Sequence, residues 1–161
     1  MNVNYQTDTT HAYQTITINI QAPQAHIFKL LATTDGIQQW FPQLSFEEEK
    51  VGSRLLFDLG NDQYEYFNIT DYEPKHHIAY TWDTGHVDFT LEETGENVQL
   101  TFKEALPYTF KTIGNDFTGW YFQIQSVKKL AETGQPLSQA EFDFASKTEE
   151  IEQALNLPNS N

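Results

Sequence analysis

Aromatic side chains are the residues of this sequence best suited to form a binding site. The chain of 161 residues contains 12 Phe, 8 Tyr and 3 Trp. Such rings pack well in a core, and they also line pockets for apolar or aromatic ligands. Ordinary core packing is therefore the alternative for each ring. The residues expected to bind a ligand, all but one of them aromatic, are Trp40, Phe41, Phe57, Glu65, Phe67, Tyr80, Trp82, Phe89, Phe117, Trp120 and Tyr121.

Three further positions bear on this site. Strand alternation puts Glu65 on the face of Phe67, where its carboxyl group could orient a ligand or act as a base, unless the strand end reaches solvent. Arg54, the only arginine, could bind a carboxylate, although alternation directs it away from Leu55 and towards a surface ion pair. A glycine inside a helix costs about 1 kcal/mol relative to alanine, so at Gly119 we expect the close approach of a strand backbone or a ligand.

Residue types that support catalysis or metal binding are sparse. The histidines share no helical i, i+4 spacing, and the absence of cysteine excludes thiolate chemistry; they are His11, His26, His76, His77 and His86. No glycine-rich phosphate loop, HExxH motif or nucleophile motif occurs. The sequence therefore predicts no catalytic residue, metal or cofactor, and it favours binding over enzymatic activity.

The charge balance restricts the partners. The chain has 23 acidic residues against 9 Lys and Arg, a formal net charge of −14. A field of this sign repels nucleic acids and anionic membrane surfaces. With no cysteine, no signal-like leader and no apolar run of about 20 residues, we expect a cytoplasmic protein.

An antiparallel sheet is indicated by alternating apolar residues between turn signals. Residues 15–20 form the first predicted strand, and several hairpins follow over residues 46–104. A two-residue loop at Gly95 and Glu96 pairs Phe89 with Phe102. A four-residue loop over 83–86 pairs Trp82 with Val87 and Tyr80 with Phe89, and the hairpin at Pro74 brings Ile69 beside Tyr80 and Phe67 beside Trp82.

Helices are predicted on both sides of these hairpins. Residues 23–33 form a short amphipathic helix, and Asp35 caps a second one that carries Trp40. A longer helix over 115–133 follows a cap at Asn115 or Asp116 and ends at Gly134. We expect a polar, frayed leader at 1–12, one domain at 13–134 and an acidic tail at 135–161, with a possible short helix over 148–155.

Five local motifs occur in a familiar order. They are Ala22-Pro23, Trp40-Phe41-Pro42, Val51-Gly52-Ser53-Arg54, Glu73-Pro74 with Tyr80-Thr81-Trp82, and Gly119-Trp120. Over residues 14–134 the chain thereby resembles the START-like (SRPBCC) proteins, in the branch similar to activators of the ninety-kilodalton heat-shock chaperone's ATPase. Ser53 and Lys75 depart from that branch, which often has a glycine and a proline there.

The resemblance implies an α+β helix-grip fold, in which a curved antiparallel sheet wraps a long C-terminal helix and two short helices follow the first strand. It leaves three functions open. The first is binding of a small hydrophobic or aromatic ligand between sheet and helix. The second is a co-chaperone that contacts a chaperone through its acidic surface. The third is a polyketide cyclase-like enzyme, which requires Glu65, Tyr80 or Arg54 to face the cavity.

Overall fold

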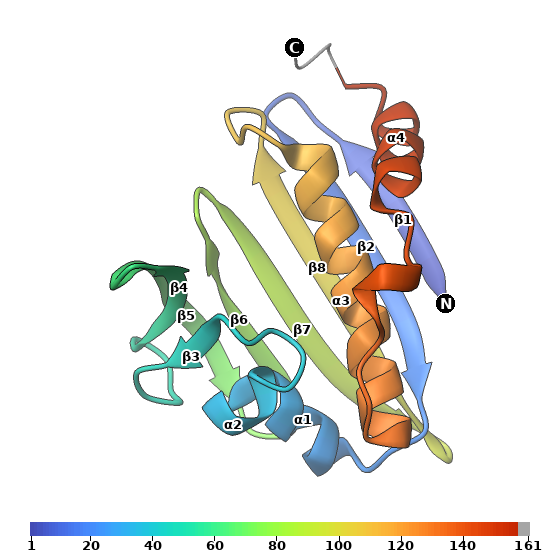
Figure 1. Ribbon diagram of the computed structural model, residues 1–161. Helices are drawn as coiled ribbons and strands as arrows, with labels where there is room; N and C mark the ends of the chain where they lie inside the picture. Colours follow the sequence, from blue (N-terminus) through green and yellow to red (C-terminus); the bar gives the residue numbers. More distant parts are fainter. Residues whose placement is uncertain (158–161) are drawn as a thin grey trace.

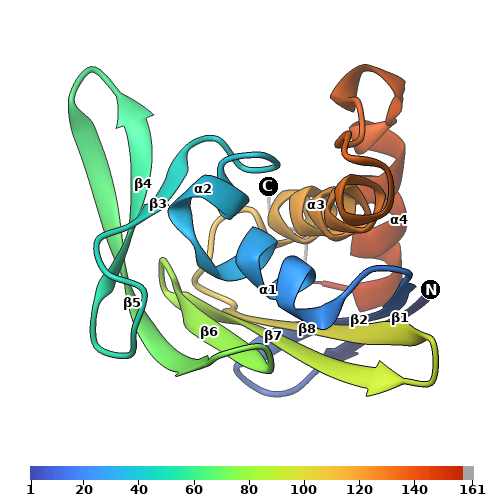
Figure 2. The same cartoon turned by 90° about the horizontal axis from the view of Figure 1, so that it is seen from below.

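Eight antiparallel strands form one curved sheet in the computed structural model, which describes residues 1–157. Along the sheet the order is β1-β2-β8-β7-β6-β5-β4-β3. Figure 2 shows the sheet bending upwards at its β4 and β5 side, so that it partly encloses the helices. The strands are β1 (Asn2–Thr7), β2 (His11–Ile20), β3 (Leu44–Phe46), β4 (Arg54–Gly60), β5 (Gln63–Glu73), β6 (His77–Trp82), β7 (Gly85–Thr94) and β8 (Asn97–Pro107).

The helices lie on the concave face of this sheet (Figures 1 and 2). They are α1 (Gln24–Ala32), α2 (Thr34–Ile37), α3 (Ile113–Thr133) and α4 (Phe144–Leu155), with a 3-10 turn at Gln139–Glu141. The α+β helix-grip fold predicted from the sequence is therefore confirmed. Within residues 1–157, no helix combines the length and apolarity that a membrane crossing requires.

Two helix starts differ from the prediction. The hydroxyl of Thr33, not the side chain of Asp35, accepts a hydrogen bond from the amide of Gly36 at 3.0 Å and so caps α2. Helix α3 begins at Ile113, earlier than the expected caps, because the first turn already buries apolar surface. Its C-terminal end is as predicted, since Gly134 adopts the left-handed conformation with φ 82°.

The predicted pairing is correct in two of the three hairpins. Phe89 pairs with Phe102 across β7 and β8, and Ile69 pairs with Tyr80 across β5 and β6. The four-residue loop is wrong, because Trp82 pairs with Gly85 and Tyr80 with Val87 across a two-residue turn. Asp83 takes a positive φ of 54° there, the conformation that a tight hairpin requires. The slip is two residues, so every side chain keeps its predicted face.

The polar leader expected to be frayed is an ordered edge strand. Strand β1 pairs along its whole length with β2, from Asn2 opposite Thr17 to Thr7 opposite Ala12. Its mixed sequence carries little apolar alternation because only one face is partly covered, as Val3 and Tyr5 pack against the two core clusters. An edge strand without a fully buried face shows little alternation of apolar and polar residues in its sequence.

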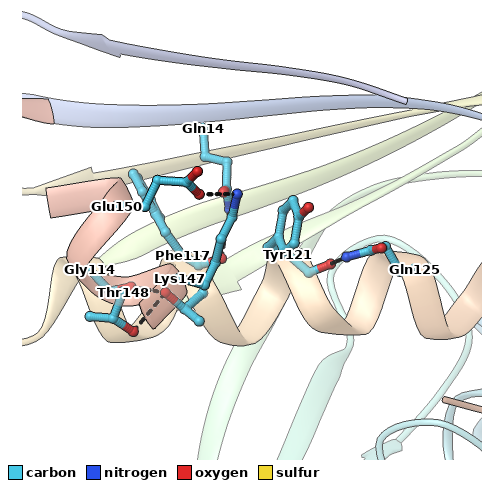
Figure 3. Close-up of polar contacts among 9 residues, drawn as sticks. Gln14, Gly114, Phe117, Tyr121, Gln125, Lys147, Thr148 and Glu150 are labelled. Carbon is cyan, nitrogen blue, oxygen red and sulfur yellow. Dashed lines mark hydrogen bonds and ion pairs between the residues drawn. The ribbon is translucent and has the colours of Figure 1, made fainter. Parts of the chain in front are cut away.

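Helix α4 in the tail packs against α3 and the β1 edge of the sheet (Figure 1). A second apolar cluster at this contact contains Ile151 and Leu155 of α4 and Phe117 of α3. Thr148 donates a hydrogen bond from its hydroxyl to Thr118 at 2.8 Å, and Lys147 lies 4.1 Å from the ring centre of Tyr121 (Figure 3). The helix starts four residues before the predicted one and is an integral layer of the fold.

The substitution Ile151→Ala tests whether the tail contributes to the folded core. Ile151 is fully buried, and removing a buried isoleucine side chain costs about 2–5 kcal/mol. We expect urea unfolding to show a loss of that size in one cooperative transition. Glu149→Ala on the exposed side of the same helix should change the free energy of unfolding by less than about 0.5 kcal/mol. Equal, small effects of both changes would contradict this role of α4.

Candidate functional site

Most of the predicted ligand-binding rings meet in one cluster between α3 and the sheet. Trp120 of α3 lies at its centre, with its ring 5.0 Å from Trp82 and 6.2 Å from Trp40. Trp82 in turn lies 5.1 Å from Phe67. The predicted residues brought together are Trp40, Phe41, Phe57, Phe67, Tyr80, Trp82, Phe89 and Trp120. Phe102 of β8, 5.2 Å from Trp120, belongs to the same cluster.

Two predicted site residues, Phe117 and Glu65, lie elsewhere. Phe117 belongs to the second apolar cluster beside α4, where it stacks on Tyr5 at 6.4 Å. Tyr121 packs against the main cluster and also on Phe142 of the tail at 6.0 Å. Glu65 is exposed at the solvent end of β5, although it pairs with Phe57. Helical periodicity puts Phe117 on the face of Trp120, but it could not show that the first turns of α3 meet a separate cluster formed by Ala12, Leu106 and α4.

The open apolar cavity expected between sheet and helix is largely filled by these rings. Trp120 and Tyr80 are 2% and 0% exposed. What remains is a small pocket of about 140 Å³ at the side of α3. Four larger hollows of about 400 to 580 Å³ lie on the outer surface, and none of them is lined by a ring of the cluster. The small pocket is lined by Phe41, Trp82, Asn115, Asp116, Gly119, Trp120 and Gln123.

Gly119 forms the open wall of this pocket. No heavy atom lies within 4 Å of the position that a Cβ would take there. The sequence led us to expect that either a strand backbone or a ligand approaches Gly119 closely. The structure excludes the strand backbone. The absence of a side chain instead leaves space beside the rings of Trp82 and Trp120, in the middle of a helix where glycine is unfavourable.

A row of buried polar side chains crosses the inner face of the sheet beneath α3. The register aligns Gln14 of β2 with Glu104 of β8, then Val87 of β7 and Tyr80 of β6. Gln14 and Glu104 are 0% and 1% exposed. The Nε2 of Gln14 donates to the carbonyl of Phe117 at 3.0 Å and to the Oε1 of Glu104 at 3.5 Å, and Figure 3 shows Gln14 reaching towards α3.

Our sequence reasoning missed Gln14 and Glu104, although a signal was present. Glu104 falls in phase with the inward-facing residues Leu100 and Phe102 of the same strand. Gln14 likewise precedes Ile16 in the inward phase of β2. A polar residue that continues an apolar alternation is a candidate for a buried polar group that needs a partner.

Glu104 of β8, which is buried, and Asp116 of α3, which is half-buried, form a carboxyl pair at the edge of the pocket. Burial raises the pKa of Glu104 well above its ordinary value, and the charge of the neighbouring Asp116 raises it further. The Oε2 of Glu104 and the Oδ2 of Asp116 are buried and have no hydrogen-bond partner among the described residues. The folded state therefore favours the protonated, neutral form of Glu104.

Trp82 and Tyr80 are two further polar groups near these carboxyl groups. The indole Nε1 of Trp82 donates to the Oδ1 of Asp116 at 3.1 Å. The hydroxyl of Tyr80 is buried without a partner in the described chain, and burial raises its pKa. Neutral Tyr80 and protonated Glu104 are thus both potential hydrogen-bond donors in the interior.

The remaining candidates lie outside the site. Arg54 forms the surface ion pair that alternation favoured, with the Oε2 of Glu47 at 2.6 Å, and it lies over the ring of Tyr66 at 4.3 Å. His77 contacts Asp88 at 2.7 Å. Within residues 1–157, no cluster of three or more His, Asp or Glu side chains is arranged to hold a metal ion.

The substitution Glu104→Gln tests the protonated state of this carboxyl group. Above its ordinary pKa of 4.5, the unfolded chain releases the proton that folded Glu104 retains, so the free energy of unfolding falls as pH rises towards the folded pKa. Glutamine keeps the shape and cannot ionise. We expect urea unfolding between about pH 5 and pH 8 to show a smaller loss of stability in this variant than in the native chain.

The exposed turn residue Glu96 is the matched control, because Glu96→Gln changes the net charge equally. The free energy of unfolding of Glu96→Gln should depend on pH in the same way as that of the native chain. If the Glu104→Gln curve also follows it, Glu104 is ionised in the folded protein.

Comparison with known proteins places this geometry in a family. The model of the family described as "Activator of Hsp90 ATPase homolog 1-like protein" matches residues 21–132. A conserved protein of unknown function from Enterococcus faecalis, EF2215, is 29% identical with a TM-score of 0.88, over 98% of this chain and 92% of that one. No curated protein matches the chain.

Two more distant structures share the fold. The Aha1 dimer from Colwellia psychrerythraea is 22% identical with a TM-score of 0.64, over 74% of this chain and 96% of that one. CalU16 from Micromonospora echinospora is 17% identical with a TM-score of 0.71, over 96% and 94%. Since the family model spans well over half of the sequence, this chain belongs to the activator of Hsp90 ATPase homolog 1-like proteins, within the START-like superfamily.

Proposed function

We propose that this protein binds a small ligand in the pocket beside Gly119, between α3 and the aromatic cluster. The observation that carries the proposal is the open space at Gly119, next to Asp116 and Gln123, whose side chains each have a buried oxygen without a hydrogen-bond donor among residues 1–157. Aromatic walls with a few placed polar groups are typical of ligand sites. Membership of a ligand-binding superfamily supports the same function.

The size of the pocket restricts the ligand. Pockets for drug-sized ligands measure about 300–1,000 Å³, whereas this one measures about 140 Å³. Burying about 100 Å² of apolar ligand surface yields only ~2.5 kcal/mol, which is less than the ~4 kcal/mol that lost freedom costs at minimum. A small ligand therefore needs hydrogen bonds or charge attraction to bind usefully, and the oxygens of Asp116 and Gln123 are placed for that purpose.

A chaperone-directed role is the second candidate, because the family is described as activators of the Hsp90 ATPase. The net charge of −14 would present an acidic outer surface to such a partner. A cyclase-like activity has less support. CalU16 shares the fold, but Glu65 and Arg54 are exposed and only Tyr80 faces the interior. A cytoplasmic location is consistent with each of these roles.

The pair Gly119→Ala and Gly119→Leu tests ligand binding. Alanine fits without a contact and favours the helix by about 1 kcal/mol, while leucine also fills the pocket. In a thermal-shift screen of small polar and aromatic compounds, we expect ligands that raise the Tm of the native chain to lose their effect on Gly119→Leu. Both variants should remain at least as stable as the native chain without ligand. A screen in which no compound shifts the native chain would count against binding.

A reconstituted ATPase assay tests the second candidate. Purified Hsp90-type chaperone should hydrolyse ATP faster when this protein is added, and the stimulation should weaken as salt rises, because an acidic surface acts through screened charges. Gly119→Leu serves as the control, because it leaves the outer surface unchanged and should stimulate equally. No change in ATPase rate at low salt would remove this candidate.

A further inference from the structure

We propose that the ligand of this pocket carries a primary ammonium group, which lies between the Asp116 carboxylate and the rings of Trp82 and Trp120. This inference rests on the proposed binding function and adds the chemical class of the ligand. Three features of the described residues support it: the Asp116 carboxylate, which belongs to no ion pair, the pocket oxygens that accept hydrogen bonds, and the aromatic walls.

The first feature is a carboxylate without a counter-charge. Asp116 lies in the first turn of α3 and lines the pocket. None of the ion pairs in residues 1–157 involves Asp116 or its neighbour Glu104. The neutral indole of Trp82 is the one hydrogen-bond donor recorded for Asp116 in that part of the chain. The Oδ2 of this half-buried carboxylate is buried with no cation beside it, and a cationic ligand would supply the partner.

The second feature is that the unsatisfied atoms of the pocket are acceptors. The Oδ2 of Asp116 and the Oε1 of Gln123 are both buried, and Gln123 Oε1 has no donor among residues 1–157. A ligand group that binds the Oδ2 of Asp116 must donate a hydrogen bond, so a carboxylate or a phosphate does not fit beside this oxygen. A primary ammonium has three N–H donors, whereas a quaternary ammonium has none. The oxygens therefore favour a primary amine.

The third feature is the composition and size of the walls. Phe41, Trp82 and Trp120 line the pocket, and cations are attracted to the faces of such rings, most strongly to tryptophan. A volume of about 140 Å³ equals that of about five water molecules in the liquid, which suits a short alkyl chain. The net charge of −14 raises the local concentration of cations at the entrance.

Three molecules of one shape test the inference: isobutylammonium, isobutanol and isobutyrate. Titration is followed by the indole N–H resonance of Trp82 in ¹H–¹⁵N spectra, because this group donates to Asp116. We expect isobutylammonium to bind about tenfold more tightly than isobutanol, and isobutyrate not to bind. Gly119→Leu should abolish all binding.

The substitution Asp116→Asn removes the charge and retains an oxygen that accepts from Trp82. It should bring the affinities for isobutylammonium and isobutanol to within about twofold of each other. Asp71→Asn changes the net charge equally at an exposed position of β5 and should preserve the tenfold preference.

The outcomes separate the two proposals. Equal affinities of the native chain for isobutylammonium and isobutanol, both lost in Gly119→Leu, would overturn the ammonium inference and leave the pocket as a binding site. Binding of isobutylammonium that survives both Gly119→Leu and Asp116→Asn would show attraction by the acidic surface alone and would also overturn it. Failure of all three probes to move the Trp82 resonance would overturn both proposals.

Discussion

The packing of Trp120 against the inner face of the sheet is the contact on which the rest of the structure depends. Its ring lies within 6.2 Å of five others, which come from the segment after α2 and from β6, β7 and β8: Trp40, Phe41, Trp82, Phe89 and Phe102. These contacts fix the distance and the angle at which α3 crosses the sheet. Because aromatic pairs favour tilted and edge-to-face geometry, they fill a curved space that flat stacking would leave partly empty.

This dense packing explains why polar chemistry is confined to one band of the interior. Where the large rings end, Gln14 and Glu104 occupy inward positions of β2 and β8, and the main chain of Phe117 and the side chain of Asp116 meet them from α3. A carboxyl group in this dry surrounding is stable only as a neutral donor or with a partner. Glu104 and Tyr80, whose pKa values are raised by burial, both lie in this band.

The second apolar cluster supports the N-terminal part of α3. Ile151 and Leu155 of α4, which follow residue 132 where the family match ends, pack there in one cluster with Phe117 of α3 and Ala12 of β2. The polar contacts between Thr148 and Thr118 and between Lys147 and Tyr121 fix the direction of α4 along this face. The tail thereby holds α3 against the sheet close to the carboxyl pair.

Periodicity and turn chemistry, which are local properties, were sufficient to predict the strands between residues 46 and 104, the long helix and the face on which Phe67, Tyr80 and Trp82 lie. The alternation fixed each side chain's face even where the hairpin at Asp83 was two residues shorter than predicted, because a shift of two residues does not change the face. The family motifs added the connectivity. None of these signals depends on contacts between remote segments.

Only the tertiary structure decided how completely the rings fill the interior, which face of α3 meets α4, and which polar groups lose their water. Phe117 and Trp120 are both buried on one face of the same helix, yet they belong to different clusters, because Phe117 lies one turn closer to the start of α3, where Ala12, Leu106 and α4 surround it. Glu104 is an ordinary strand residue in the sequence, and its pKa depends on burial beneath α3 beside Asp116. Volume and desolvation arise from atoms far apart along the chain, so no local pattern contains them.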